Sequence, residues 1–359
     1  MIQPIEINGR EISSKNTPYI IAEISANHNG SLENAMKLIT EAKRCGADAV
    51  KLQTYTPDTI TLNSDTKDFQ IDDGLWKGHT LYSLYEKAHT PWAWHKPLFE
   101  HAKNLDISIF STPFDRSAVT FLESLNTPAY KIASFEITDT DLISSVAATK
   151  KPMIISTGMA DLEDIELAVR TAKESGCHNL VLLHCVSGYP APASDYNLAT
   201  MVDMSHRFRI PIGLSDHTIS NTTAISAVAL GATVIEKHFT LNRDGGGPDD
   251  SFSLEPSELT HLVQATKEAY SARGAINYAP KKSELSNLKF RRSIYFTRDQ
   301  EAGEVITRDS IKSVRPGYGL SPKYFQQLLG QPLLLPAKAG TATTLQHFFN
   351  KESEGTIQC

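Results

Sequence analysis

The sequence has few cysteines and no long apolar run, and both scarcities exclude classes of protein. Its 359 residues include four cysteines, at positions 45, 177, 185 and 359, with no Cys-x-x-Cys pair. A disulfide framework or a zinc ribbon needs more closely paired cysteines, so a reducing, cytoplasmic compartment is expected. No run of 18 apolar residues occurs, and residues 1–16 lack a charged segment followed by an apolar core. The sequence therefore predicts neither a membrane span nor a signal peptide.

Basic residues are also too few for a typical nucleic-acid-binding protein. Thirty-five Lys and Arg against 41 Asp and Glu give a formal net charge of -6, whereas a nucleic-acid-binding domain usually presents a basic face. Hydrophobic residues make up 40% of the chain and charged residues 21%, which is ordinary for a globular protein. The length is sufficient for one large domain and one small one. Small-molecule substrates are expected, without a nucleic acid or a membrane as partner.

Short apolar segments rich in Val and Ile recur along the first 240 residues, and helical patterns separate them. Continuous apolar strands that alternate with helices are typical of a parallel sheet covered by helices. Eight such units favour an α/β fold, a (β/α)₈ TIM barrel. The predicted strands are residues 19–25, 48–54, 108–113, 129–134, 153–158, 180–185, 212–217 and 233–239. A helix is expected between Ser31 as N-cap and Gly46 as C-terminal stop, and another between Asp161 and Gly176.

The chain divides into a large and a small part. The barrel is predicted to occupy residues 1–272 and to carry a long insertion at 57–95 after the second strand, of a length that is usually functional. Residues 273–288 look like a polar linker. Short strand-like pieces, "RRSIYFT", "EVIT" and "IKSVRPGYG", predict a small β-rich domain at 289–349. Residues 350–359 are expected to be disordered.

Polar side chains stand at the end of every predicted barrel strand. Active sites of TIM barrels lie at the carboxyl ends of the strands, and buried charges are costly unless they are paired. We therefore expect these side chains to converge on one site. They are Glu23, Lys51, Gln53, Ser111, Thr112, Lys131, Ser134, Glu136, Ser156, Thr157, His184, Ser187, Ser215, Asp216, His217, Glu236, Lys237 and His238.

Two kinds of residue in this set indicate chemistry. His217 and His238 follow adjacent strands, and imidazoles with carboxylates and water suit Mn²⁺, Zn²⁺ or a similar divalent metal. A single histidine at a strand end is more often a hydrogen-bonded structural residue, so the interpretation depends on the pair. Lys51 and Lys131 are suited to neutralise a phosphate or a carboxylate of a substrate, and the alternative is that they only pair with Glu23 or Glu136.

Several motifs at these positions resemble one family. "IAEISANHNG", "ADAVKLQTYTPDT", "STPFD", "AYKIASFE", "STGMA", "GLSDHT" and "IEKHF" are together similar to the sialic acid synthase family of enzymes that condense phosphoenolpyruvate (PEP) with a sugar. The tail "SVRPGYGLSPKYFQQLLG" resembles the antifreeze-like (SAF) domain of that family. The resemblance extends over residues 15–348 and implies a TIM barrel followed by a SAF domain.

The resemblance also implies roles for individual residues. Glu23 corresponds to the acid beside the reacting carbons, and His217 and His238 correspond to ligands of a divalent metal, Mn²⁺ with Mg²⁺ or Co²⁺ as alternatives. Arg315 corresponds to a residue that reaches from the SAF domain of a partner subunit into the barrel, in a domain-swapped homodimer. The implied PEP-binding residues are Lys51, Thr112, Lys131, Ser134, Ser156, Ser187 and Ser215. The implied sugar-binding residues are Gln53, Glu136, Tyr189, Asp249 and Arg315, with Asp250 beside Asp249 as a second acid.

Within that family, "QTYTPDTITL", "GLWKGHTLYSLYEKAHTPWAWH", "YKIASFE" and "RPGYGLSPKYFQQLLG" resemble the branch that makes pseudaminic acid more than the branch that makes N-acetylneuraminate. This implies condensation of PEP with 2,4-diacetamido-2,4,6-trideoxy-L-altrose. Three other functions stay open at this point. They are the same chemistry on N-acetylmannosamine or a legionaminic acid precursor, a metal-dependent aldolase or hydrolase that does not use PEP, and a binding protein that acts through its C-terminal domain.

Overall fold

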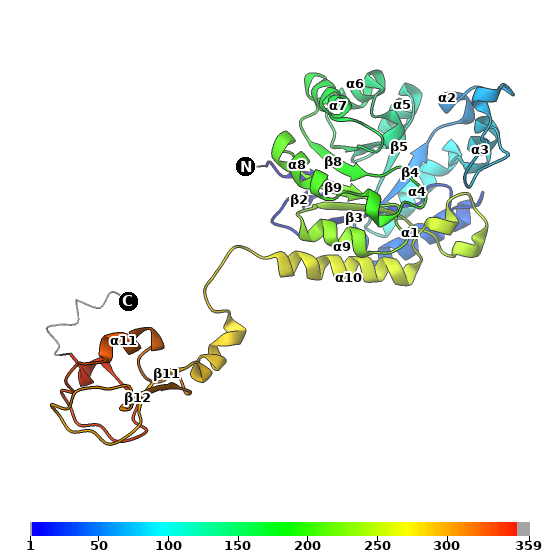
Figure 1. Cartoon of the computed structure of the whole chain (residues 1–359). Coiled ribbons are helices and arrows are strands. Elements are labelled where there is room, and N and C mark those ends of the chain that lie inside the picture. The colour runs from blue at the N-terminus through cyan, green and yellow to red at the C-terminus, as the bar shows by residue number, and fades with distance from the viewer. Residues whose placement is uncertain (1, 350–359) are drawn as a thin grey trace. The chain divides into compact units, whose positions relative to one another are not determined.

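The computed structural model describes residues 2–349, and the chain separates into two compact units between Gly274 and Ala275 (Figure 1). Each unit is described by itself. The predicted disordered tail, residues 350–359, lies outside the described residues.

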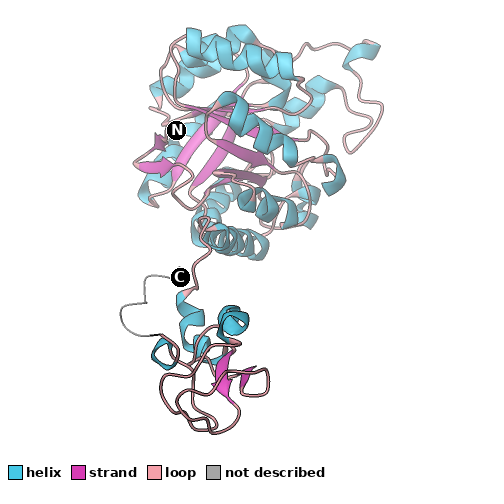
Figure 2. Ribbon diagram, turned by 60° about the vertical axis from the view of Figure 1, so that its left-hand side comes forward, coloured by secondary structure: helices cyan, strands magenta, loops and turns pink. Residues whose placement is uncertain are grey.

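The first unit is a closed barrel of eight parallel strands, which confirms the predicted TIM-barrel fold. The strands follow one another around the barrel in chain order, and the last pairs with the first. Figure 2 shows them enclosed by helices. They are β3 (Tyr19–Glu23), β4 (Ala49–Thr54), β5 (Ser108–Pro113), β6 (Tyr130–Ile132), β7 (Met153–Ser156), β8 (Leu180–Cys185), β9 (Ile212–Ser215) and β10 (Val234–His238).

Helices link the strands and cover the outside of the barrel. Ser31 caps the first of them, where its hydroxyl accepts a hydrogen bond from the Asn34 backbone N–H, and Gly46 ends it in the left-handed region at φ 90°. Asp161 caps its helix in the same way. Both caps are as predicted. The helices are α1 (Leu32–Cys45), α4 (Trp92–Asn104), α5 (Arg116–Ser124), α6 (Thr140–Ala147), α7 (Leu162–Glu174), α8 (Ala199–Phe208), α9 (Thr222–Ala229) and α10 (Pro256–Arg273).

An N-terminal hairpin, absent from the sequence prediction, closes the barrel at the amino-terminal ends of its strands, here called the lower end. Strands β1 (Ile5–Ile7) and β2 (Arg10–Ile12) pair antiparallel around Asn8 and Gly9, which both have positive φ. Asn-Gly between alternating apolar residues is a strong hairpin signal and would have predicted it. The hairpin's isoleucines join one buried cluster with inward-facing strand residues. This floor cluster consists of Ile5, Ile7, Ile12, Tyr19, Ile21, Ala49, Phe110, Ala129, Ile154, Val181, Leu183 and Val234.

The long insertion between β4 and β5 is partly helical. It contains α2 (Pro57–Ile60) and α3 (Leu81–Ala88), and α4 then begins at Trp92. Helix α4 packs beside α1 on the outside of the barrel, so it serves as the ordinary helix of the second βα unit. The additional segment is therefore residues 55–91.

The second unit is a small β-containing domain with its own core. Strands β11 (Ser293–Phe296) and β12 (Ile311–Val314) pair antiparallel, and the short α11 (Phe325–Leu328) packs nearby. Its buried core includes Ile294, Phe296, Ile306, Ile311 and Leu328. The stretch "EVIT" forms only an isolated bridge, between Val305 and Pro332, and not a strand. A nine-residue 3₁₀ segment, Lys282–Phe290, precedes the domain.

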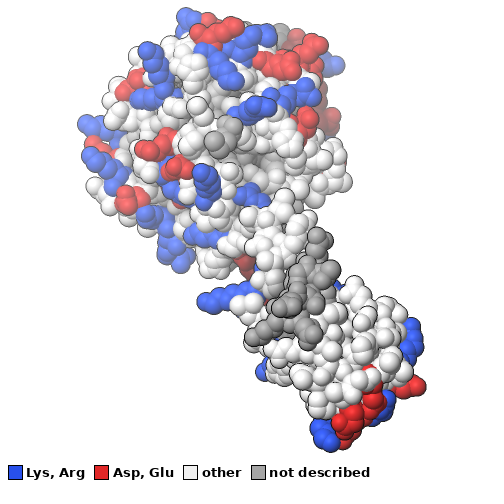
Figure 3. Space-filling view, turned by 90° about the vertical axis from the view of Figure 1, so that its left-hand side faces the viewer, with Lys and Arg blue, Asp and Glu red and all other residues white. Residues whose placement is uncertain are grey.

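Charged residues of both signs are interspersed on the face of the molecule that Figure 3 shows. Within residues 2–349, no helix is both long enough and apolar enough to cross a membrane.

Candidate active site

Strand alternation decides which polar residues enter the barrel. Successive side chains of a strand point to opposite faces, and the floor cluster marks the inward-facing positions, such as Ile21 in β3 and Ala49 in β4. Two residues further along the same strands, the same face presents Glu23 and Lys51, which are also register partners. Applied to all eight strands, this places the following residues inside the barrel at its carboxyl end, here called the mouth: Glu23, Lys51, Gln53, Thr112, Lys131, Ser156, Cys185, Ser215, His217, Glu236 and His238.

Four buried charges form a network at the centre of the mouth. Lys51 Nζ lies 2.7 Å from a carboxylate oxygen of Glu23 and 3.7 Å from one of Glu236. Lys131 Nζ lies 3.9 Å from the same oxygen of Glu236. All four side chains are at most 7% exposed. We call Glu23, Lys51, Lys131 and Glu236 the mouth network. Glu236 lies between the two ammonium groups, and its other carboxylate oxygen is buried without a hydrogen-bond partner.

The environment moves the pKa values of these groups in different directions. Burial raises the pKa of Glu23 to about 7, although Lys51 opposes the shift. Burial alone would lower the pKa of Lys51, but the nearby carboxylates of Glu23 and Glu236 raise it overall. The pKa of Lys131 is lowered, because burial outweighs its more distant carboxylate. The mouth therefore holds one firmly charged lysine, one lysine that is more easily neutralised, and a glutamate able to gain or lose a proton near neutral pH.

Hydroxyl groups surround the two lysines. Lys51 Nζ donates to Thr112 Oγ1 at 3.1 Å, and Lys131 Nζ donates to Ser156 Oγ at 2.6 Å. Ser215 Oγ donates to Glu236 at 3.5 Å. Ammonium groups flanked by hydroxyls form a suitable cradle for the oxygens of a phosphate or carboxylate.

Ser134 and Ser187 lie together on one side of this cradle. Ser134 Oγ accepts a hydrogen bond from the Gly158 backbone N–H at 3.2 Å. A Cβ atom at Gly158 would lie 2.3 Å from Ser187 Oγ and 2.9 Å from Ser134 Oγ. Only glycine therefore lets both hydroxyls approach the backbone here. With these two serines, all seven residues predicted to bind PEP lie at the mouth.

The two predicted metal ligands lie side by side. The ring centroids of His217 and His238 are 5.5 Å apart. His217 Nδ1 is 2.8 Å from the Val186 carbonyl oxygen; because a carbonyl only accepts, Nδ1 carries a proton, and in the neutral ring Nε2 keeps its lone pair. His238 Nδ1 is buried without a hydrogen-bond partner. Burial, with His217 nearby, lowers the pKa of His238, which favours the neutral ring that binds metals.

These two imidazoles fit a divalent metal that water and substrate oxygens would also ligate. In the described part of the chain, no group of three or more His, Cys, Asp and Glu is arranged to hold a metal ion. The protein's own contribution to such a site would thus be the two histidines, with the other coordination positions left open for a reactant.

The predicted sugar-binding residues extend outward from Glu23. Gln53 Nε2 donates to Glu23 at 3.0 Å and to Ser25 Oγ at 2.9 Å, and Ser25 Oγ donates to Asp249 at 2.5 Å. The four residues form a continuous chain of polar groups. Tyr189 lies beside the imidazoles, with its ring centroid 4.3 Å from that of His217.

Glu136 presents a buried carboxylate oxygen that has no hydrogen-bond partner. Burial raises its pKa to about 7. An unsatisfied polar atom of this kind suits a ligand hydroxyl.

Asp250 has a different role from Asp249. Its carboxylate accepts from Thr240 at 2.5 Å, from Asn29 at 3.0 Å and from the Gly247 backbone N–H at 2.8 Å. A Cβ atom at Gly247 would lie 1.8 Å from Asn29 Oδ1. The loop that carries both acids is therefore closely packed, and Asp250 stabilises it.

Five polar residues expected at the mouth are turned away from it, which corrects the prediction that all strand-end residues converge. Strand alternation is the reason, since each is one residue out of phase with the inward-facing set. Two of the five, Lys237 and Asp216, pair with each other: Lys237 Nζ donates to Asp216 at 2.9 Å and to the Thr218 carbonyl at 2.6 Å. A third, His184, bonds the Tyr196 carbonyl. The others are Ser111, which bonds Thr54, and Thr157, which bonds the Leu183 carbonyl.

Cys185 is not among the predicted site residues, but it faces the mouth. Its Sγ atom is 3.4 Å from Ser134 Oγ and 4.0 Å from His217 Nδ1. The signal was present in the sequence, because Cys185 is in phase with the inward-facing Val181 and Leu183. Arg315, the one predicted site residue from the C-terminal part, belongs to the second unit and directly follows β12.

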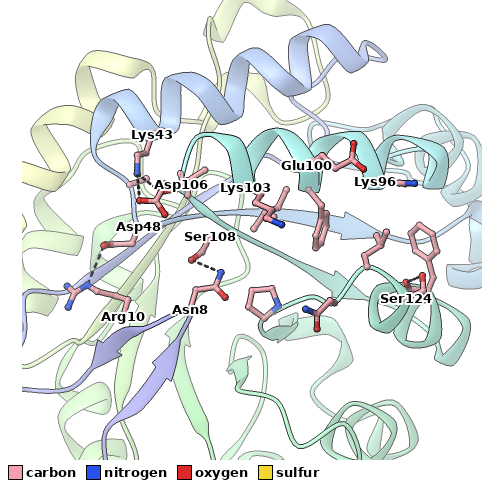
Figure 4. A pocket seen from close by; sticks show the side chains of 18 of the residues that line it. Asn8, Arg10, Lys43, Asp48, Lys96, Glu100, Lys103, Asp106, Ser108 and Ser124 are labelled. Atoms are coloured by element: carbon pink, nitrogen blue, oxygen red, sulfur yellow. Dashed lines mark hydrogen bonds and ion pairs between the residues drawn. The ribbon is translucent and has the colours of Figure 1, made fainter.

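A separate cavity of about 1310 Å³ lies at the opposite, amino-terminal end of the strands. Figure 4 shows two of its cations beside acids, Arg10 against Asp48 and Lys43 against Asp106. The buried side-chain atoms without partners that occur among the described residues belong to residues outside its lining. The reactive groups therefore concentrate at the mouth and not in this cavity.

A TIM barrel whose mouth holds two buried lysines, a ring of hydroxyls and two adjacent imidazoles defines a class: a barrel protein suited to bind an anionic small molecule at the carboxyl ends of its strands. The NeuB family model matches residues 38–278 and the SAF domain model matches residues 291–348. The chain belongs to the NeuB family and is an enzyme of the sialic acid synthase type, as the motifs predicted.

Named relatives cover nearly the whole chain. A pseudaminic acid synthase of Campylobacter jejuni subsp. jejuni is 46% identical over 90% of this chain and 94% of the relative. An N,N'-diacetyllegionaminic acid synthase of Legionella pneumophila is 38% identical over 95% of this chain and 98% of the relative. Among solved structures, an N-acetylneuraminic acid synthetase of Leptospira borgpetersenii in complex with citrate has a TM-score of 0.72 and 32% identity, covering 80% of this chain and 96% of that one.

Proposed function

We propose that the protein is a pseudaminic acid synthase, a transferase of class EC 2.5.1. It would condense PEP with 2,4-diacetamido-2,4,6-trideoxy-L-altrose and water to give pseudaminic acid and phosphate. The observation that carries the proposal is the 46% identity to a pseudaminic acid synthase over 90% of the chain, against 38% for the legionaminic acid synthase. Such a product would serve bacterial surface glycans, including glycosylated flagellin, and its synthesis would be cytoplasmic.

The mouth network suits PEP, which carries a phosphate and a carboxylate on three carbons. Lys51 and Lys131 would hold these two anionic groups, and the hydroxyls of Thr112, Ser134, Ser156, Ser187 and Ser215 would orient them. Fixed donors of this kind act by orientation and by electrostatic stabilisation of developing charge. When PEP binds, Glu236 keeps the two ammonium groups close together although they repel each other.

Carbon–carbon bond formation needs an activated aldehyde on the acceptor sugar. A divalent metal held by His217 and His238, which we infer to be Mn²⁺ with Mg²⁺ or Co²⁺ as alternatives, supplies Lewis-acid polarisation of that aldehyde when it is bound. Gln53, Glu136, Tyr189 and Asp249 would hold the sugar's hydroxyl and amide groups, and the buried unpartnered oxygen of Glu136 supports this role.

Glu23 lies where positive charge would develop. Attack by carbon 3 of PEP on the aldehyde carbon forms the C–C bond and leaves positive charge on carbon 2. The Glu23 carboxylate, 2.7 Å from Lys51, would stabilise that charge. Water then adds to carbon 2, the C–O bond to phosphate breaks, and the product ketone forms. With a pKa of about 7, Glu23 is able to take up the first proton that this water loses, and the second neutralises the alkoxide formed from the aldehyde.

The proposal also includes a domain-swapped homodimer, in which Arg315 of the partner subunit would contact the sugar. Three large apolar side chains on loops at the barrel mouth support a covering partner: Phe135, Met159 and Ile219 are 61%, 64% and 50% exposed. Inactive His238→Ala chains mixed with inactive Arg315→Ala chains should regain activity, because mixed dimers would contain one complete site. No recovery after mixed refolding would argue against the swap.

The acceptor sugar is tested by direct competition. Purified enzyme with PEP and Mn²⁺ is assayed for phosphate release with the diacetamido-trideoxy-altrose, with the legionaminic acid precursor and with N-acetylmannosamine. The first sugar should give the highest kcat/KM by at least 100-fold. Preference for either other sugar would make this a legionaminic acid or N-acetylneuraminate synthase, and phosphate release independent of the sugar would refute condensation.

A further inference from the structure

The insertion between β4 and α4 places a short loop against the active-site mouth. Residues 70–80 form this loop, which Gln70 and Thr80 close with an antiparallel bridge. The Ile71 backbone N–H donates to the His79 carbonyl at 2.9 Å, and the Gly78 N–H donates to the Ile71 carbonyl at 3.0 Å. Thr80 then caps α3. We call residues 70–80 the insertion loop; its internal hydrogen bonds give Trp76, near its tip, a defined position.

Trp76 contacts two parts of the mouth at once. Its indole Nε1–H donates to the Pro248 carbonyl at 3.1 Å, and its ring centroid is 6.1 Å from that of Tyr189. Pro248 directly precedes Asp249, which is bonded to Ser25. The half-buried indole therefore fixes the loop that carries the candidate sugar-binding acid and lies against the candidate sugar-binding tyrosine.

An aromatic wall continues from Trp76 to the imidazoles. The ring centroids of Tyr189 and Phe252 are 5.3 Å apart, and that of Phe252 is 5.0 Å from that of His238. Trp76, Tyr189 and Phe252 thus place a continuous apolar surface beside the two imidazoles of the mouth. A hydroxyl-rich hexose gains little from such a wall, whereas a deoxy sugar with acetamido groups presents methyl groups to it.

We propose that Trp76 is a specificity-determining residue, which packs against the methyl groups of a deoxy, diacetamido acceptor sugar and anchors the loop that carries Asp249. The proposal rests on the proposed function, and it assigns to the insertion loop the choice between acceptors that differ in apolar substituents. Apolar groups in a pocket typically discriminate between substrates by 10–200-fold, which is the effect that Trp76 would account for.

The test compares Trp76→Ala with wild type, using PEP and two acceptors, the diacetamido-trideoxy-altrose and N-acetylmannosamine. We expect the KM for the diacetamido sugar to rise at least 10-fold and the preference over N-acetylmannosamine, as a ratio of kcat/KM values, to fall at least 10-fold. The KM for PEP should stay within 2-fold. Leu62→Ala, at a 66% exposed position of the same insertion, is the matched control and should change none of these values.

An unchanged preference ratio in folded Trp76→Ala overturns the proposal, whether kcat/KM is unaffected or falls equally for both acceptors. A tryptophan with a purely structural role would not distinguish the two sugars. If that variant fails to fold, Trp76→Phe decides. Pro248 then loses its donor, so the sugar KM should rise 3–10-fold with the PEP KM unchanged, and no rise overturns the proposal.

The two proposals fail separately. Wild-type preference for another acceptor refutes the proposed function, whereas a ratio that is insensitive to Trp76 refutes only the role of this residue.

Discussion

The same eight strands form both ends of the barrel interior, but one end is apolar and the other is charged. At the lower end, the inward-facing positions form the floor cluster, which is apolar apart from the hydroxyl of Tyr19. Two residues further along the same strands, the same face carries the mouth network of two lysines and two glutamates, each at most 7% exposed. In β3 the change occurs between Ile21 and Glu23, and in β4 between Ala49 and Lys51.

This difference separates stability from function. Burying apolar surface at the floor lowers the free energy of the folded state, whereas burying charges at the mouth costs free energy that pairing only partly offsets. A sequence selected for stability alone would also have apolar side chains at the inward-facing positions of the mouth. The charged layer is thus the part of the interior retained for catalysis, and substitutions at the two ends should affect different quantities.

The largest effect is expected from removing the inferred metal at the mouth. Excess EDTA should abolish phosphate release, and added Mn²⁺ should restore it, because the aldehyde would lose its Lewis acid. His238→Ala should also lose Mn²⁺ binding in calorimetry. As a control, EDTA should leave the melting temperature of His238→Ala unchanged, because this variant has already lost the inferred metal. Full turnover in excess EDTA would refute metal dependence.

At the floor, Phe110→Ala should lower the free energy of unfolding by about 4 kcal/mol, because it leaves a cavity where a fully buried ring packs. Denaturant titration measures this loss. The kcat/KM of the folded fraction should stay within 3-fold of wild type. Leu230→Ala, at a 49% exposed position, is the control and should cost less than about 1 kcal/mol. A large loss of activity in folded Phe110→Ala would break the separation between the two ends.

In the mouth network, Glu236→Gln should act on catalysis. The substitution keeps the shape but removes the negative charge 3.7 Å from Lys51 and 3.9 Å from Lys131, so no carboxylate between the two ammonium groups offsets their repulsion. We expect kcat/KM for PEP to fall about 100-fold, equivalent to about 2.7 kcal/mol. Steady-state kinetics with PEP varied measures it. Ser215→Ala removes only the hydroxyl that donates to Glu236 and should lose less, and equal losses would contradict the charge argument.

Glu136→Gln should make the protein more stable above neutral pH. Burial raises the pKa of Glu136 from its ordinary 4.5 to about 7, so the folded state favours the protonated acid. The resulting stability is complete below pH 4.5 and is lost as the pH rises through 7. The shift corresponds to about 3 kcal/mol, reduced to about 2 kcal/mol because the residue is partly exposed. Melting curves of variant and wild type should coincide at pH 4 and separate at pH 8, with the variant melting higher. A constant difference at both pH values would contradict this.

Most of the fold follows from short-range patterns, and the differences have identifiable physical causes. The eight strands were predictable because both faces of a barrel strand are buried, which produces continuous apolar runs. The caps Ser31 and Asp161 were predictable because they satisfy local backbone groups. The orientation of strand-end residues was harder, since an apolar run on both faces conceals strand phase. This is why Lys237 and His184 were grouped with residues of the mouth.

The part of the candidate site that sequence reasoning missed depends on tertiary contacts. The position of Glu236 between two lysines requires three strands to be placed together, and that of Trp76 requires a loop from the insertion to meet Pro248. Neither pairing has a local signal. The N-terminal hairpin was missed although Asn8-Gly9 signalled it, because a strand pair of three residues each gives little periodicity.

The smallest predicted effect tests whether that hairpin belongs to the floor. Ile7→Val removes one methylene from a side chain that is 0% exposed and should lower the free energy of unfolding by about 1 kcal/mol. Ile2→Val, at a 40% exposed position before the hairpin, should change it by less than about 0.5 kcal/mol. Kinetic constants for both substrates should be unchanged in both variants. If Ile7→Val were as neutral as Ile2→Val, the hairpin would not contribute to the stability of the barrel, and the strands alone would stabilise the floor. A loss of stability without a loss of turnover would instead show that the lower end is closed by this separate element, so that the mouth can carry charges at the other end of the same strands.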